Sequence, residues 1–278
     1  MDPMISTAAL AERLGAAELV IIDATWFMPG TPRDARAEHA ERRIPGAVFF
    51  DIDEVSDEES PLPHMLPSPA VFAAHARRLG VHPNSEIVVY DAQGLFSAAR
   101  LWWSFRTMGH DRVRVLDGGL PAWLAEGRPV ETGERTPLPG RFEARLDAGL
   151  VRDLARVRAA LAGDGEQLLD ARSAARFRGE APEPRPGLRS GHMPGALNLP
   201  FDEVLGEGRL LPADALERRF RTAGVDLGRP VVTTCGSGLT AAVLALALAR
   251  LGAWRTAIYD GSWSEWGATD DTPVVSGP

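Results

Sequence analysis

Short apolar runs alternate with amphipathic stretches along the whole chain. Residues 87–90 and 231–234 are runs rich in β-branched residues, a pattern typical of strands that are buried on both faces of a sheet. Residues 70–79 and 213–223 place apolar side chains at helical spacing. Strands that alternate with helices predict an α/β fold in which helices flank a parallel sheet. Such sheets bind their ligands at the carboxyl ends of the strands.

The alternating pattern occurs twice, because four segments recur in one order at offsets of 143 to 149 residues. The pairs are IIDAT from Ile21 and LLDAR from Leu168, RIPGA from Arg43 and HMPGA from His192, YDAQGLFSAA from Tyr90 and TCGSGLTAAV from Thr234, and VLDGG from Val115 and IYDGS from Ile258. So long a period indicates two copies of one domain. We expect domains 1–138 and 139–278, with the joint inside residues 131–142, where Pro, Gly and charged residues interrupt the apolar pattern.

Composition and charge narrow the class of protein. Apolar residues make up 45% of the chain and charged residues 24%, which is ordinary for a soluble globular protein. The net charge of -8 argues against a nucleic-acid partner. The longest apolar run, residues 239–249, is too short to cross a membrane, and Arg13 is the only basic residue among the first 24. We therefore expect a cytoplasmic protein without a membrane segment.

Candidate chemistry centres on Cys235, the single cysteine, which directly follows the run 231–234. One cysteine excludes an internal disulfide and a cysteine-cluster metal site. The segment CGSGLT then leads into a strong helix former, and its two glycines allow a left-handed backbone whose N–H groups turn inward as an anion cradle. A thiolate there would be a nucleophile stabilised by those donors and the helix dipole. The alternative is an inert buried cysteine.

The repeat distinguishes the two copies. Asp91 stands in the first copy where Cys235 stands in the second, so the first loop has no sulfur nucleophile. This favours one catalytic copy and one copy that serves as a scaffold.

With these segments placed, the sequence resembles the tandem-domain rhodanese-type sulfurtransferases, and within them the branch that uses 3-mercaptopyruvate. The resemblance covers nearly the whole chain, including RIPGAVFFDIDEV, HMLPSP, RFRGEAPEPRPG, SGHMPGALNLPF and YDGSWSEW. Thiosulfate-using members carry cationic residues after the cysteine, whereas Gly236, Ser237 and Gly238 match the uncharged loop of the mercaptopyruvate branch. Leu239, in place of a more usual valine, and Thr240 complete the six-residue loop.

The resemblance also implies roles for residues outside the loop. Arg176 and Arg185 match the two arginines that bind the substrate carboxylate, while Arg178 has no matching role; without the family, all three would be interpreted as surface residues. Asp53 and His64 match an Asp–His–Ser relay that ends at Ser237. Both belong to the expected first domain, so this relay would require a site between the domains. The alternative for Asp53 and His64 is a loop hydrogen-bond pair.

The function that follows from the resemblance is sulfur transfer from 3-mercaptopyruvate through a Cys235 persulfide. Pyruvate leaves, and the sulfur passes to thioredoxin, a small thiol or cyanide, without a metal or organic cofactor. We also expect a monomer and no disulfide switch.

Three alternatives stay open. A thiosulfate sulfurtransferase would keep the fold and change the donor. A cysteine-dependent phosphatase would need a longer loop that ends in an arginine, where this chain has Ala241 and Ala242. A non-catalytic binding module would not need the cysteine that the second copy keeps. A further departure from the family is Arg43, which stands where the first copy often has a histidine, in a motif that we interpret as a structural turn.

Overall fold

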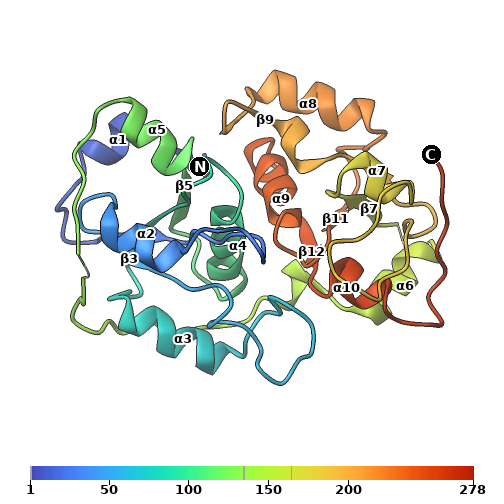
Figure 1. Cartoon of the computed structure of the whole chain (residues 1–278), viewed down its shortest axis with the longest axis horizontal. Coiled ribbons are helices and arrows are strands. Elements are labelled where there is room, and N and C mark those ends of the chain that lie inside the picture. Colours follow the sequence, from blue (N-terminus) through green and yellow to red (C-terminus); the bar gives the residue numbers. More distant parts are fainter. Residues whose placement is uncertain (1, 134, 164) are drawn as a thin grey trace. The chain divides into compact units, whose positions relative to one another are not determined.

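The computed structural model describes residues 2–133, 135–163 and 165–278, and it divides into two units (Figure 1). The first unit contains Met1–Asp57, Leu66–Asp147 and Glu207–Leu210. The second contains Glu58–Met65, Ala148–Gly206 and Leu211–Pro278. Residues 1, 134 and 164, which fall within the two expected domains, lie outside the described residues.

The first unit is built on a five-stranded parallel sheet of order β1-β5-β4-β2-β3. Its strands are β1 (Met4–Ile5), β2 (Leu19–Asp23), β3 (Val48–Phe49), β4 (Glu86–Tyr90) and β5 (Val113–Leu116). The helices are α1 (Thr7–Ala11), α2 (Ala35–Glu41), α3 (Pro69–Arg78), α4 (Ala98–Thr107) and α5 (Gly119–Ala125). The short strand β10 (Arg209–Leu210) also belongs to this unit.

The second unit repeats this arrangement with a five-stranded parallel sheet of order β6-β12-β11-β7-β8. Its strands are β6 (Val151–Arg152), β7 (Gln167–Asp170), β8 (Leu197–Asn198), β11 (Val231–Thr234) and β12 (Ala257–Tyr259), with β9 (Leu205–Gly206) outside the sheet. The helices are α6 (Leu154–Leu161), α7 (Ala174–Phe177), α8 (Ala213–Thr222), α9 (Ala241–Arg250) and α10 (Ser262–Trp266), and the 3-10 turns are η1 (Ala148–Leu150) and η2 (Phe201–Val204).

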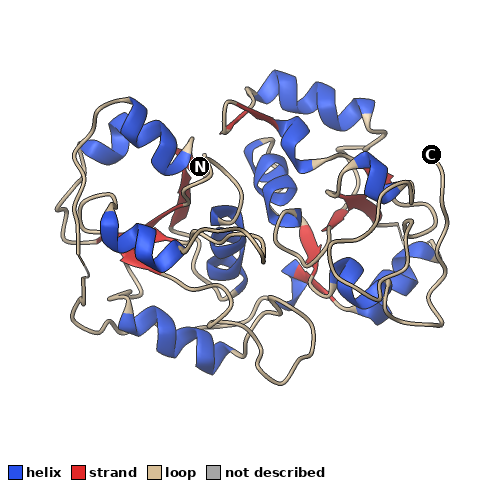
Figure 2. Cartoon of the chain, in the orientation of Figure 1, coloured by secondary structure: helices blue, strands red, loops and turns tan. Residues whose placement is uncertain are grey.

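The two sheets confirm the predicted fold class and the repeat. Every residue of β4 and of β11 is buried, as expected for strands covered on both faces, and helices surround the strands of each unit (Figure 2). The expected helices at 70–79 and 213–223 correspond to α3 and α8 within one residue at each end. No helix among the described residues is long and apolar enough to cross a membrane.

Two segments lie in a different unit from the one that the sequence suggested. Residues 139–147 belong to the first unit, because the amides of Phe142, Arg145 and Asp147 bond to carbonyl groups of that unit at 2.7–3.1 Å. The expected boundary after residue 138 therefore lies before the end of the first unit. Residues 58–65 belong to the second unit, so His64 does not lie in the first unit with Asp53.

The RIPGA and HMPGA motifs form corresponding turns in the two units. Arg43 and Glu131 exchange backbone hydrogen bonds of 3.0 and 2.9 Å, and His192 and Val275 do the same at 2.9 and 3.0 Å. Both first residues are buried. The replacement of histidine by Arg43 therefore leaves a structural turn intact.

Candidate active site

Cys235 directly follows β11, at the carboxyl end of a strand between β12 and β7. Its side chain is almost fully buried, with 2% of the residue exposed. The loop that follows runs to Thr240, the N-cap residue of α9. The helix dipole of α9 therefore begins beside the loop, as the sequence predicted.

The two glycines of the loop serve different purposes. Gly238 has φ +75°, in the left-handed region that favours glycine. Gly236 does not adopt a positive φ, so the prediction of a left-handed backbone at both glycines is wrong for this residue. A Cβ at position 236 would lie 3.1 Å from Nη2 of Arg176, so the absence of a side chain at Gly236 lets the guanidinium approach the loop.

The carbonyl groups at the start of the loop bond to α10. The amide of Trp263 donates to the Cys235 carbonyl at 2.9 Å, and the amide and hydroxyl of Ser264 donate to the Gly236 carbonyl at 2.9 and 2.7 Å. Because a trans peptide points its C=O and N–H in opposite directions, the next two amides face the other way.

Four amides of the loop remain available to an anion. Among the described residues, the N–H groups of Gly236, Ser237, Leu239 and Thr240 donate to no protein acceptor. Unpaired backbone donors at a helix N-terminus favour a bound negative charge. These residues therefore provide the anion cradle that the sequence suggested.

His64 and Ser237 lie together within the second unit. His64 Nδ1 and Ser237 Oγ are 2.9 Å apart, and both residues are about 5% exposed. His64 also has φ +60°, an uncommon conformation for a residue other than glycine and one that clusters at functional sites. Asp53, in the first unit, accepts a 2.8 Å hydrogen bond from the indole of Trp26. The Asp53 step of the relay stays a prediction.

A buried ion-pair chain extends from β7 toward the loop. Arg172 binds Asp170 and Glu183, each at 2.7 Å, and Glu183 binds Arg176 at 2.5 Å. Burial lowers the pKa of Arg172, but the two carboxylates outweigh it and raise the pKa above the ordinary value. The Arg172 guanidinium also lies 4.1 Å from the ring centroid of Trp263.

The ion pair with Glu183 leaves one nitrogen of the Arg176 guanidinium available. Its Nε and Nη2 face Glu183, whereas Nη1 has no protein partner among the described residues, and the side chain is 24% exposed. Arg185 is half-buried in the loop between α7 and β8. Arg178 is paired with Glu180 at the surface, as its lack of a family role suggested.

Sequence reasoning missed Asp170, Arg172 and Glu183. The available signal was an acidic residue inside an arginine-rich segment, RFRGEAPEPR, together with the arginine that ends LLDAR. No role was predicted for Glu183 from the sequence, yet its side chain is 2% exposed and lies between two guanidinium groups.

The equivalent loop of the first unit is closed by its own side chain. The fully buried Asp91 carboxylate accepts amide hydrogen bonds of 2.8–3.0 Å from Gln93, Phe96, Ser97 and Ala98. Burial raises the pKa of Asp91, and the four amide bonds oppose that effect. A loop of this shape therefore holds an anion within the same chain.

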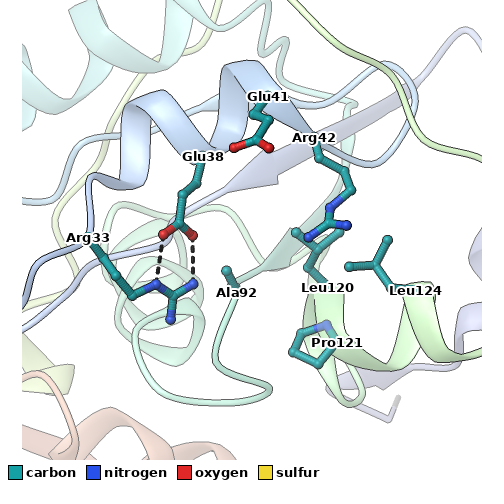
Figure 3. A pocket seen from close by; sticks show the side chains of 8 residues that line it. All are labelled: Arg33, Glu38, Glu41, Arg42, Ala92, Leu120, Pro121 and Leu124. Atoms are coloured by element: carbon teal, nitrogen blue, oxygen red, sulfur yellow. Dashed lines mark hydrogen bonds and ion pairs between the residues drawn. The ribbon is translucent and has the colours of Figure 1, made fainter.

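A pocket of about 300 Å³ lies beside the first loop (Figure 3). Two hydrogen bonds, of 2.7 and 2.6 Å, join Arg33 to Glu38 on one side of it, and that contact raises the pKa of Arg33. The full lining is Arg33, Glu38, Glu41, Arg42, Ala92, Leu120, Pro121 and Leu124. The lining contains no thiol or hydroxyl, so it offers no nucleophile corresponding to Cys235.

The sequence profile of the Rhodanese-like domain matches residues 6–126 and 153–269, one match in each unit. The chain belongs to the rhodanese family. Its two rhodanese-like domains correspond to the two parallel sheets, and Cys235 lies in the second.

Known proteins resemble this chain over most of its length. The 3-mercaptopyruvate sulfurtransferase of Escherichia coli is 47% identical over 95% of this chain and 95% of its own length. The Arabidopsis thaliana protein named thiosulfate/3-mercaptopyruvate sulfurtransferase 1, mitochondrial, is 42% identical over 99% of this chain and 78% of its own length. The crystal structure of SseA from E. coli, of the 3-mercaptopyruvate sulfotransferases, matches with a TM-score of 0.87 at 42% identity, covering 95% and 99% of the two chains.

No group of three or more His, Cys, Asp or Glu side chains in the described part of the chain is arranged to hold a metal ion.

Proposed function

We propose that this rhodanese-family protein is an enzyme that transfers the sulfur of 3-mercaptopyruvate to a thiol acceptor through a persulfide on Cys235. The observation that carries this proposal is Nη1 of Arg176, which has no protein partner among the described residues, beside an uncharged loop in which the amides of Gly236, Ser237, Leu239 and Thr240 donate to no described acceptor. A carboxylate-bearing donor can bind the guanidinium while its sulfur faces the thiol.

The chemical step begins with attack of the Cys235 thiolate on the sulfur of mercaptopyruvate. A sulfur–sulfur bond forms, the bond between that sulfur and C3 breaks, and its electron pair passes to the enolate of pyruvate. The proton of the substrate thiol ends on the new methyl group, so pyruvate and an enzyme persulfide are the products. This is covalent catalysis with a stable intermediate, and its amide cradle would stabilise the outer sulfur as an anion.

Ser237 and His64 are proposed to move that proton. Their 2.9 Å contact lets the imidazole polarise the serine hydroxyl at the loop. The Asp53 carboxylate would complete this relay by orienting the imidazole. Removing the hydroxyl in Ser237→Ala is expected to lower kcat by about 100-fold, within the usual range for general acid–base catalysis. A Ser237→Ala variant with unchanged kcat and an unchanged pH profile would remove the relay from the mechanism.

The second substrate takes the outer sulfur by attack of its own nucleophile. Thioredoxin, a small thiol or cyanide fits this step, which restores the Cys235 thiolate without a cofactor. A monomer in the cytoplasm remains our expectation. The Arabidopsis relative is named as mitochondrial, which is a property of that protein.

The neutral loop favours mercaptopyruvate over thiosulfate as the donor. Thiosulfate is a compact dianion that leaves as sulfite, whereas mercaptopyruvate carries one carboxylate and needs a cation only at that end. Comparing Arg176→Ala with Arg178→Ala separates these donors, because Arg178 is an exposed arginine two residues away. Loss of a charge-assisted hydrogen bond is expected to lower kcat/KM for mercaptopyruvate by about 10- to 100-fold in Arg176→Ala and to leave Arg178→Ala unchanged.

Each rival predicts another result in this comparison. A thiosulfate sulfurtransferase would turn over thiosulfate more efficiently and would lose little activity with either donor in Arg176→Ala. A binding module would turn over neither donor, and its buried thiol would react slowly with an alkylating reagent.

A further inference from the structure

We infer that Ser262 and Ser264 are positioning residues that orient the reactive loop for sulfur transfer. The inference rests on the proposed function, because it concerns the loop that would carry the persulfide. Both residues are in α10, outside the loop, and they touch its first two residues. We call them the α10 serine pair.

Ser262 adopts a conformation that its residue type disfavours. It is fully buried with φ +51°, whereas the equivalent residue in the first unit is Gly119 with φ +54°. A serine held in the left-handed region, where the repeat uses glycine, points to a role for its hydroxyl. That hydroxyl accepts the Cys235 amide at 3.3 Å and donates to the Tyr259 carbonyl at 2.8 Å.

Ser264 holds the next peptide. Its amide and hydroxyl both donate to the Gly236 carbonyl, at 2.9 and 2.7 Å. Fixing this carbonyl points the Ser237 amide the opposite way, toward the cradle. Pro121 occupies the equivalent position in the first unit and offers neither donor.

The remaining contact is common to both units. The amide of Trp263 donates to the Cys235 carbonyl at 2.9 Å, and the amide of Leu120 donates to the Asp91 carbonyl at 2.9 Å. The serine pair is therefore specific to the unit with the cysteine. The first loop needs no such contacts, because its anion is a tethered carboxylate held by four amides. The Cys235 sulfur, which would gain and lose a second sulfur in each cycle, cannot fix the loop amides in this way. Hydrogen bonds from α10 therefore fix the loop backbone instead.

The repeat supplies matched variants that suit the backbone. Ser262→Gly and Ser264→Pro introduce the residues with which the first unit forms the same turn. Ser264→Ala removes only the hydroxyl, and Ser264→Thr keeps it. We expect about a tenfold loss of kcat in Ser262→Gly and in Ser264→Ala, about a 100-fold loss in Ser264→Pro, and recovery of most activity in Ser264→Thr.

The deciding measurement is the rate of Cys235 alkylation by iodoacetamide across pH, with thermal unfolding recorded for each variant. We expect the half-maximal rate to move to higher pH in the three hydroxyl-lacking variants, while Tm stays within a few degrees of the wild type. Wild-type kcat and alkylation profiles in all three, or losses that follow a fall in Tm and are not recovered in Ser264→Thr, overturn the inference.

The alkylation profile does not depend on which donor the enzyme uses. If the wild type fails to turn over mercaptopyruvate, the proposed donor is wrong, yet the profiles still decide whether the serine pair orients the loop.

Discussion

The loops at residues 91–97 and 235–240 each connect a strand to a helix, and they differ in what their amides bind. Both follow a buried parallel strand and lead into a buried helix, α4 or α9. In the first, four amides converge on the Asp91 carboxylate. In the second, Cys235 takes that position and the amides of Ser237 and Thr240 have no protein acceptor among the described residues.

The difference shows how a duplicated domain loses or keeps a reactive site. A carboxylate that fills the cradle makes the first loop self-contained, since four of its amides bind that carboxylate. In the second loop the amides of Ser237 and Thr240 bind no described acceptor, and the support comes from outside the loop: the α10 serine pair and the ion pairs among Arg172, Glu183 and Arg176. The reactive loop therefore depends on more of its domain than the closed loop does.

Moving the thiol from the second loop to the first should have the largest effect on kcat of the changes considered. Cys235→Ser is expected to lower kcat by at least about 10⁴-fold, because the nucleophile is lost while the side-chain volume is nearly kept. Adding Asp91→Cys to that variant should not restore turnover, since Gly119 and Pro121 stand where the second unit has the α10 serine pair. Steady-state kinetics checks both variants, and circular dichroism checks that they fold. Restored turnover in the double variant would mean that the loop alone is sufficient.

The ion-pair chain should have the largest effect on stability. Glu183→Gln leaves Arg172 and Arg176 with one fewer carboxylate in a buried setting, so the free energy of unfolding should fall by about 3–5 kcal/mol. The exposed pair of Arg178 and Glu180 supplies a control, because Glu180→Gln should change stability by less than about 0.5 kcal/mol. Urea unfolding measures both. Equal stabilities for the two variants would show that the chain is not a structural support.

The repeat, the α/β class and the position of Cys235 could be predicted because they depend on local patterns. β-Branched runs such as residues 231–234 are typical of strands that are buried on both faces of a parallel sheet. The family resemblance singled out Arg176, whose guanidinium does lie beside Gly236.

The contacts that support the loop could not be predicted, because they join residues distant in sequence. Ser264 reaches Gly236 across 28 residues, and nothing local distinguishes it from a solvated helix residue. From the sequence, Gly236 was expected to adopt a left-handed conformation. In the structure its φ is not positive, and its lack of a side chain instead allows the Arg176 guanidinium to approach the loop. His64 came from a segment interpreted as part of the first domain, and only the tertiary structure places residues 58–65 with the second.

Asp91→Asn tests how much the carboxylate in the first loop contributes to stability. The amide cannot accept all four N–H groups as the carboxylate does, so the free energy of unfolding should fall by about 1–3 kcal/mol. Because burial raises the folded-state pKa of Asp91 above 3.8, its contribution is largest below that pH and declines as pH rises through the folded-state pKa. The stability difference between wild type and variant should therefore shrink from acidic to neutral pH. A difference that grows with pH would mean that the amides lower the pKa instead.

Substitutions at the two loop glycines should have the smallest effects. Gly238→Ala should change stability, whereas Gly236→Ala should change substrate binding. Gly238→Ala places a Cβ at φ +75° and should cost about 1 kcal/mol of stability. Gly236→Ala meets Nη2 of Arg176 without a positive φ, so it should raise KM for mercaptopyruvate about threefold and leave Tm nearly unchanged. Thermal unfolding and initial-rate kinetics on the pair check this assignment, and the reverse pattern would contradict it.

The central claim is that Cys235 carries the transferred sulfur while the first loop stays closed. Mass spectrometry of the enzyme after one equivalent of 3-mercaptopyruvate, without an acceptor, tests it most directly. The account predicts one equivalent of pyruvate and one added sulfur atom on the peptide that contains Cys235. A small thiol added afterwards should remove that sulfur and restore the unmodified enzyme. An unmodified Cys235 peptide after full conversion of the substrate to pyruvate would contradict it.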